Sequence, residues 1–223
     1  EINDNYPVNV PLSMLFGDLP ITEMSITHNS FDNISDKEPE AIDLKSSVIK
    51  TLQHPTVASK SFLITIGDRT VGGMVARDQF IGPFQVPVSD YSLSLRSFTS
   101  TTGEVLSIGE KPTLALTNPA ASMRMALAEA LTNMIGVVIK GLNYVQVSAN
   151  WMAASGEKQQ DIALRDGVEA LSKMSVDLKV SIPVGKDSLS MKTKWSDNGN
   201  ELEVTSPLSG VITAMAPVED ITV

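Results

Sequence analysis

Hydrophobic residues recur every three or four positions in three segments of the chain, which is the spacing of one face of an α-helix. The predicted helices are residues 36–54, 120–140 and 161–178. The first is short and amphipathic, with Leu44, Val48 and Leu52 on one side. The second is the clearest, because Asn118 provides an N-cap, Pro119 suits the first turn and Gly141 follows the last periodic residue.

Between and after these helices the pattern changes to short apolar runs or to strict alternation, which is typical of β-strands. The predicted strands are residues 62–66, 70–75, 91–96, 105–108, 113–116, 144–147, 180–184, 189–195, 201–205 and 209–216. A turn at residues 197–199 joins two of them. Because the strands come in consecutive runs, we expect an α+β fold, a largely antiparallel sheet with helices packed on one face.

The first 35 residues differ from the rest of the chain. They are rich in Asn, Asp, Pro and Ser, with one apolar cluster at residues 11–16. We therefore interpret residues 1–35 as an extended connector arm with little regular structure, and residues 36–223 as one domain. The chain starts with Glu1 and stops within a pattern at Val223, which suggests a fragment of a longer chain.

Composition excludes several classes of function. The chain has 26 acidic and 17 basic residues, a formal net charge of -9, which disfavours a nucleic-acid-binding protein. It has no cysteine, which excludes disulfides, thiolate metal sites and a thiol nucleophile. No apolar run approaches the roughly 20 residues needed to cross a bilayer. A cytoplasmic protein without a membrane segment is expected.

Glu129 and Asn133 form a polar pair on the otherwise apolar helix 120–140. They are four residues apart, so their side chains project from the same side. Carboxylate and amide oxygens suit Mg²⁺, which takes one or two protein ligands together with phosphate oxygens and water. The same pair also suits an ordinary solvated helix face, and the spacing alone does not decide between the two.

Two loops are further candidates. Residues 185–188, Gly-Lys-Asp-Ser, lie between two predicted strands, where backbone N–H groups, an ammonium and a hydroxyl could face an anion or simply form a hairpin connection. Asp90 ends the run Gln-Val-Pro-Val-Ser at residues 85–89. It is either a cation ligand or a turn aspartate.

Seven runs of sequence, taken in order, resemble one family. They are HPTVASK (54–60), IGDRTVGGMVARDQ (66–79), GPFQVPV (82–88), AEALTN (128–133), SANWMAA (148–154), IPVGKDSLSMK (182–192) and TSPL (205–208). The family is phosphoribosylformylglycinamidine synthase in its large single-chain form. The chain resembles one domain of it, the one related to the N-terminal domain of aminoimidazole ribonucleotide synthetase in the second half of the synthase core.

The resemblance implies a place in purine synthesis. The family's enzyme is an ATP-dependent ligase that converts formylglycinamide ribonucleotide and glutamine to formylglycinamidine ribonucleotide. The second-half domain contributes to a Mg²⁺-nucleotide site that often holds a tightly bound ADP. Asp90, Glu129 and Asn133 match the family's metal-binding positions, and Ser89 stands where a nucleotide-contacting residue, commonly alanine, is found. Lys186, Asp187 and Ser188 are candidates for contacts with the nucleotide.

The resemblance also implies partners and leaves two functions open. The expected partners are ATP or ADP, formylglycinamide ribonucleotide, the first-half sister domain and the glutaminase domain, whose cysteine this chain lacks. One function is a part of the ligase active site, and the other is a non-catalytic Mg²⁺-nucleotide module that stabilises the synthase core. We expect the isolated chain to be inactive and to self-associate through the surface that the sister domain would cover.

Overall fold

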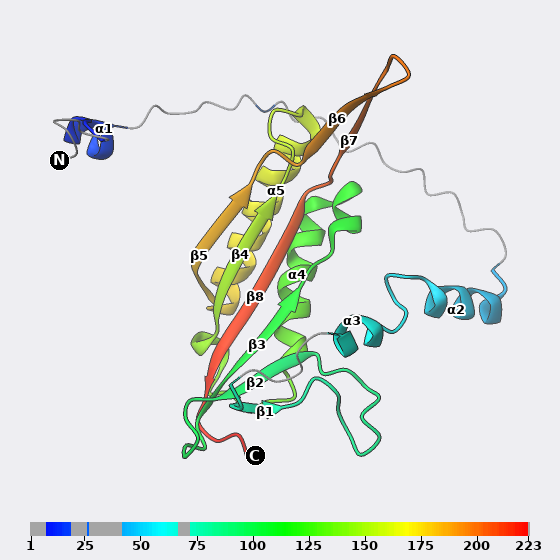
Figure 1. Ribbon diagram of the computed structural model, residues 1–223, viewed down its shortest axis with the longest axis vertical. Helices are drawn as coiled ribbons and strands as arrows, with labels where there is room; N and C mark the ends of the chain where they lie inside the picture. The colour runs from blue at the N-terminus through cyan, green and yellow to red at the C-terminus, as the bar shows by residue number, and fades with distance from the viewer. Residues whose placement is uncertain (1–7, 19–25, 27–41, 67–71, 223) are drawn as a thin grey trace, which may run out of the picture.

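The computed structural model, which describes residues 8–18, 26, 42–66 and 72–222, is built around a six-stranded β-sheet (Figure 1). The strand order is β1-β2-β3-β8-β4-β5, and every neighbouring pair is antiparallel except β4 and β5. The bounds are β1 Val75–Arg77, β2 Tyr91–Leu95, β3 Gly103–Gly109, β4 Gln146–Met152, β5 Ser181–Ser188 and β8 Ser209–Val218.

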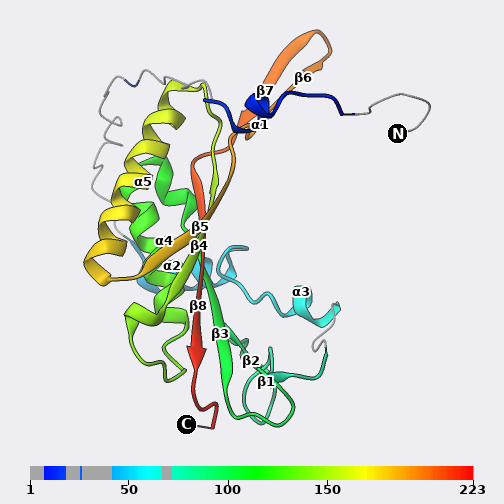
Figure 2. The ribbon, with the colours of Figure 1, turned by 90° about the vertical axis from the view of Figure 1, so that its left-hand side faces the viewer.

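Two long helices, α4 (Pro119–Asn133) and α5 (Lys158–Leu178), cover one face of this sheet (Figure 2). Asn118 caps α4 as predicted, because its side-chain oxygen accepts a hydrogen bond of 2.8 Å from the backbone N–H of Ala121. Helix α5 connects β4 to β5, which is the crossover that a parallel strand pair requires. The predicted fold class, a largely antiparallel sheet with helices on one face, is confirmed.

The core lies between the sheet and these two helices. Buried and exposed residues alternate along β3 and β8, so each strand turns every second side chain toward the helices. The largest fully buried side chains are Met123, Leu127, Leu171, Leu208 and Ile212. The opposite face of the sheet has no helix against it in the described part of the chain, and Ile108 there is 54% exposed.

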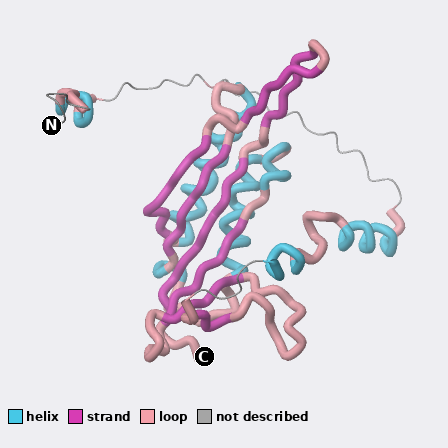
Figure 3. Tube along the Cα trace, in the orientation of Figure 1, coloured by secondary structure: helices cyan, strands magenta, loops and turns pink. Residues whose placement is uncertain are grey.

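The remaining elements lie at the edge of this core or outside it, and of their described parts only the 3₁₀ turn that contains the buried Ala115 contributes to it. They are α1 Leu12–Phe16, α2 Leu44–Gln53, α3 Ser61–Ile66, two 3₁₀ turns at Pro112–Leu116 and Leu142–Tyr144, and the strands β6 Lys192–Asp197 and β7 Asn200–Thr205. Strands β6 and β7 form a separate hairpin that projects beyond the end of the sheet (Figure 3). Its turn is the predicted one, with positive φ at Asn198 and Gly199.

Two predicted strands are wrong. Residues 62–66 belong to α3, and residues 113–116 belong to a 3₁₀ turn. Periodicity cannot distinguish a short apolar run in a strand from one in a helix, and the described residues offer residues 62–66 no strand to pair with. At the second segment, Pro112 takes the first position of the turn, and the Leu114 N–H donates to the Lys111 carbonyl.

The predicted ends of two helices are also wrong. Helix α4 stops at Asn133 instead of Lys140, because Gly136 packs against the ring of Tyr91, which donates a hydrogen bond to the Gly136 carbonyl. Helix α2 starts at Leu44 with Asp43 as its N-cap, so the described residues before it are not helical. The earlier part of that prediction, residues 36–41, lies outside the described residues.

Several predicted strands have different bounds in the structure. The predicted strand 70–75 contributes only Val75 to β1, and its first two residues lie outside the described part. The predicted strand 144–147 starts later, at Gln146, and continues to Met152. In the proposed arm, the apolar cluster contains the short helix α1, while most of residues 1–35 lie outside the described part. Among the described helices, none is both long and apolar enough to cross a membrane.

Candidate functional site

The structure brings Asp90, Glu129 and Asn133 to the same end of strand β3. Tyr91 pairs with Ser107 in the antiparallel register, so Asp90, one residue earlier, lies opposite Ile108. The side-chain amide of Asn133 donates a hydrogen bond of 2.9 Å to the Ile108 carbonyl. Glu129 accepts one of 2.8 Å from the backbone N–H of Glu110. Hydrogen bonds to residues 108 and 110 therefore hold Glu129 and Asn133, and the register of β2 against β3 places Asp90 beside the same end.

Glu129 uses both of its carboxylate oxygens. Oε2 accepts the hydrogen bond from Glu110, and Oε1 lies 2.6 Å from Nζ of Lys111. The side chains of Lys111 and Glu129 are 37% and 31% exposed, so the ion pair is partly shielded from water. A positive charge thus already lies beside the carboxylate for which the family resemblance implies a cation-binding role.

Asn133 is held so that its oxygen remains available. Its nitrogen Nδ2 donates to the Ile108 carbonyl, which leaves Oδ1 as the free acceptor of the amide. Asn133 is the last residue of α4, one helical turn after Glu129. The amide oxygen is therefore a suitable ligand for a hard cation beside Glu129.

Small residues allow α4 to approach β3 this closely. A side chain on Gly109 would place its Cβ 2.1 Å from the carbonyl oxygen of Ala126 and 2.5 Å from the backbone nitrogen of Ala130. The buried hydroxyl of Ser107 donates a hydrogen bond of 2.6 Å to the Ala130 carbonyl. Strand and helix are thus in direct backbone contact immediately beside Glu129.

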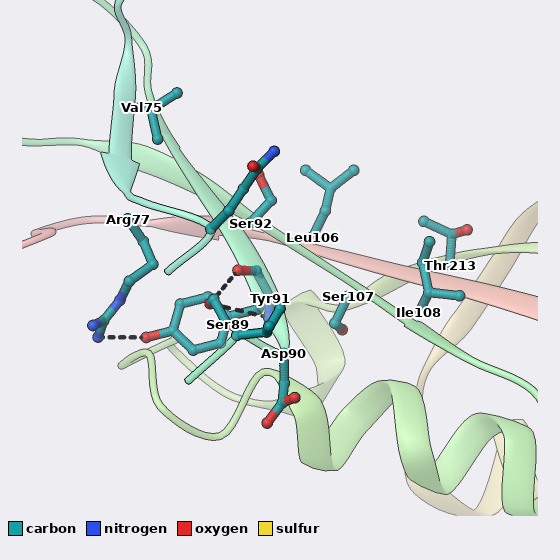
Figure 4. Close-up of a pocket in the computed structure, with 12 residues that line it drawn as sticks. Val75, Arg77, Ser89, Asp90, Tyr91, Ser92, Leu106, Ser107, Ile108 and Thr213 are labelled. Carbon is teal, nitrogen blue, oxygen red and sulfur yellow. Dashed lines mark hydrogen bonds between the residues drawn. The ribbon is translucent and has the colours of Figure 1, made fainter. Parts of the chain in front are cut away.

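A cavity of about 470 Å³ lies beside β1, β2 and β3, and of the three candidate ligands only Asp90 lines it (Figure 4). It is lined by residues of β1, β2, β3 and β8 and by the segment before β2, among them Arg77, Ser89, Asp90, Leu106, Ile108 and Thr213. In Figure 4 the carboxylate of Asp90 points away from the strands and toward helix α4. Asp90 is exposed, so its charge faces solvent at the mouth of the cavity.

Tyr91 supports the loop that carries Ser89 and Asp90. Its hydroxyl accepts a hydrogen bond of 2.8 Å from the guanidinium of Arg77 and donates one of 3.3 Å to the Gly136 carbonyl. The hydroxyl of Ser89 donates a hydrogen bond of 2.6 Å to the carbonyl of Tyr91. Ser89 thus lies at the cavity with its hydroxyl proton already used to close the turn before β2.

Lys186, Asp187 and Ser188 are not brought to this site. Residues 185–188 continue strand β5, which corrects both the expected anion-binding loop and the alternative hairpin connection. Strand β5 is the far edge of the sheet, and four strand spacings of about 4.8 Å put it about 19 Å from β2. Lys186 and Ser188 also share one face of the strand while Asp187 lies on the other. The three side chains therefore do not converge with Asp90 on one phosphate group.

The ligands available to Mg²⁺ at the junction are two carboxylates and one amide. Among the described residues, no three His, Cys, Asp or Glu side chains are grouped as a metal site. This fits a cation that takes only one or two carboxylates and completes its shell with phosphate oxygens and water. Carboxylate and amide oxygens are suitable ligands for Mg²⁺. The ammonium of Lys111 lies at Oε1 of Glu129, which shows that this oxygen can stabilise a positive charge.

Two neighbouring residues were missed by the sequence reasoning. Gly109 permits the contact between strand and helix, and Lys111 neutralises Glu129. A glycine at the end of an alternating strand is a known sign of close backbone approach, so Gly109 had a usable signal. The sequence offered no comparable sign for Lys111, because its pairing depends on how α4 folds back onto β3.

Comparison with known proteins agrees with the fold. The structure is similar to that of PurLQS from Thermotoga maritima, with a TM-score of 0.54 and 15% identity over 74% of this chain and 24% of that one. It is also similar to T. maritima PurL complexed with ADP, with a TM-score of 0.52 and 14% identity over 98% of this chain and 31% of that one. The chain thus spans less than a third of each of these proteins.

The family comparison covers more than half of the chain. Residues 59–217 match the family described as FGAR-AT PurM_N-like domain. The match includes the whole six-stranded sheet except the last residue of β8, together with both long helices. This chain belongs to the FGAR-AT PurM_N-like domain family.

Proposed function

We propose that this chain is a domain of a phosphoribosylformylglycinamidine synthase and carries part of a Mg²⁺-nucleotide site. The observation that carries the proposal is that Asp90, Glu129 and Asn133 lie at one end of β3, where Asp90 also lines a cavity. Membership of the family and the fold it shares with a PurL that was solved with ADP support the nucleotide as the ligand.

Each residue has a distinct role in the proposed site. Asp90 provides an exposed carboxylate at the mouth of the cavity, and Glu129 provides one that is held from behind by Glu110. Asn133 offers a neutral oxygen in a fixed direction. The cation, when bound, would offset the negative charge of the phosphates, which an acidic protein would otherwise repel.

Membership of the family supports a part for this chain in the synthase reaction. In the whole enzyme the domain serves ATP-dependent ligation of an amide nitrogen from glutamine onto formylglycinamide ribonucleotide. The chain is cysteine-free, so it does not contain the glutaminase nucleophile, and we expect no turnover by the chain alone. The uncovered face of the sheet, with Ile108 and Val184 each 54% exposed, is where we expect the sister domain to dock or the isolated chain to self-associate.

A second candidate function is a structural module whose bound nucleotide stabilises the synthase core. The observation that favours it is that Glu129 and Asn133 already join α4 to β3. A ligand that binds both would strengthen this junction whether or not chemistry occurs there. In the whole enzyme, Glu129→Gln should reduce mainly the rate if the site is catalytic, and mainly the stability if it is structural.

Thermal unfolding of the chain with and without Mg·ADP tests the proposed site. Ligand at about 100 times its dissociation constant should add roughly 2.7 kcal/mol to the free energy of unfolding. This gain should disappear in an Asp90→Asn/Glu129→Gln variant. The matched control is Asp177→Asn/Glu201→Gln, which removes two exposed acids elsewhere and should keep the full gain. No gain in the wild type, or equal gains in all three proteins, would refute the site.

A further inference from the structure

The ammonium of Lys111 lies where the proposed site would hold its cation. Nζ is 2.6 Å from Oε1 of Glu129, and the other carboxylate oxygen is taken by the backbone N–H of Glu110. A divalent cation on Oε1 and the ammonium would compete for the same oxygen. Oε1 therefore already has the ammonium as its partner, and a metal that binds Oε1 would have to displace it.

The backbone of Lys111 is fixed while its side chain can move. The Lys111 carbonyl accepts a hydrogen bond of 2.6 Å from the hydroxyl of Ser122 and one of 3.2 Å from the N–H of Leu114. Lys111 also precedes the 3₁₀ turn that starts at Pro112. The side chain is 37% exposed, so the ammonium can leave Glu129 toward solvent without disturbing the core.

A released ammonium would remain close to the metal. The fixed backbone keeps Nζ within one side-chain length of the end of β3, where Asp90 and Asn133 also lie. Repulsion from a divalent cation would turn it outward, toward the phosphates that the cation brings with it. A lysine ammonium is a strong point-charge partner for phosphate oxygens.

We propose that Lys111 is an internal counter-ion that gives up Glu129 to a divalent cation and then binds a phosphate oxygen of the nucleoside diphosphate. This inference rests on the proposed metal-nucleotide site. The ammonium offsets the charge of one of the two carboxylates at this end of the strand, which reduces the repulsion between them. The proposal also couples the binding of the cation to that of the nucleotide, because the cation releases the Lys111 ammonium that then binds the nucleotide's phosphate.

The test compares wild type, Lys111→Met and Lys140→Met by calorimetric titration. Lys140 forms a similar ion pair with Glu219, with Nζ 2.5 Å from Oε1, next to the ring of Tyr144 and not next to a candidate ligand, and serves as the matched control. Loss of Lys111 should make Mg²⁺ alone bind about two- to fivefold tighter, the range that a partly exposed ion pair is worth. The same variant should bind ADP at saturating Mg²⁺ at least about fivefold more weakly. Lys140→Met should change neither affinity.

A third variant, Lys111→Arg, keeps the positive charge but grips the carboxylate with two donors. It should bind Mg²⁺ alone more weakly than wild type, which gives the order Met, Lys, Arg from tight to weak. If Lys111→Met does not fold, the Lys111→Arg variant alone tests the proposal. An arginine variant that binds Mg²⁺ as tightly as wild type would overturn it.

The outcomes separate this inference from the proposed function. If wild type binds Mg·ADP but Lys111→Met binds Mg²⁺ and ADP as wild type does, Lys111 is only a surface ion pair and the inference is wrong. If wild type binds neither Mg²⁺ nor Mg·ADP, the site itself is wrong and the inference falls with it. Opposite changes in the two affinities would support both.

Discussion

Replacing Gly109 by alanine should separate strand β3 from helix α4 at the candidate site. The new Cβ would lie 2.1 Å from the carbonyl oxygen of Ala126, whereas ordinary contacts of this kind begin near 3.4 Å. The second close atom is the backbone nitrogen of Ala130, at 2.5 Å. Both belong to the helix backbone and cannot rotate away, so strand and helix must separate by about 1 Å.

Two terms contribute to the expected loss of stability. Overpacking of a well-packed core costs about 1–3 kcal/mol. The same shift stretches the hydrogen bonds from Asn133 to Ile108 and from Glu110 to Glu129, each worth about 1 kcal/mol. The free energy of unfolding should therefore fall by about 2–4 kcal/mol.

Urea denaturation followed by circular dichroism measures this loss. At a slope of about 2 kcal/mol per molar urea, the midpoint should drop by about 1–2 M. The control is Gly185→Ala in strand β5, where the new Cβ would meet its nearest atom, the Ala149 carbonyl oxygen, at an ordinary 3.8 Å. This variant should be as stable as wild type or slightly more so. If both alanine variants unfold at the same midpoint, the direct backbone contact at Gly109 does not exist.

Three further predictions concern other parts of the fold. Met123→Ala should lower the free energy of unfolding by about 2–5 kcal/mol in the same urea assay, because Met123 is fully buried against Gly167 and Gly210. The hydrogen bond and charge of Lys192 hold the pKa of Glu157 below its usual range, and Glu157 and Glu203 raise the pKa of Lys192. The lowered pKa of Glu157 stabilises the fold above its unfolded-state pKa, and this stabilisation is lost as the pH falls. The raised pKa of Lys192 stabilises the fold below its unfolded-state pKa, and this stabilisation is lost as the pH rises. The difference in melting temperature between wild type and Lys192→Met should therefore disappear below about pH 4 and again above about pH 10.5. Gly199→Val should open the hairpin β6–β7, because φ is +80° there, and the half-exposed Trp195 should report this as a red shift of its fluorescence while the main unfolding transition stays in place.

The sequence predicted well those elements in which the spacing of hydrophobic residues corresponds directly to the buried side of a strand or helix. Alternation in residues 209–216 corresponds to the alternating burial of β8, and the helical spacing of residues 164–178 corresponds to α5. The failures have tertiary causes. Helix α4 stops early because Tyr91, distant in sequence, packs on Gly136, and residues 185–188 stay extended because β4 is beside them.

The candidate site could be predicted only in part for the same reason. The spacing of Glu129 and Asn133 placed both on one side of α4, and both indeed bond to the end of β3. The position of Asp90 depends on the register of β2 against β3, which no local pattern determines. Lys186 to Ser188 were wrongly expected to form a loop because a strand that contains glycine and charged residues is hard to distinguish from a turn.

Binding and stability are coupled at this junction, and Asp90 is the residue that separates them. Glu129 and Asn133 contribute to the fold through their bonds to β3, so any substitution there changes the junction as well as the site. Asp90 is exposed, and the described residues give its side chain no hydrogen bond or ion pair, so Asp90→Asn should leave the free energy of unfolding near that of wild type. If Asp90→Asn loses Mg·ADP binding while its stability is unchanged, the loss is caused by the missing ligand contact alone. An equal loss of Mg·ADP binding in Glu129→Gln could then be attributed to a lost contact with the cation and not to a weakened junction between α4 and β3.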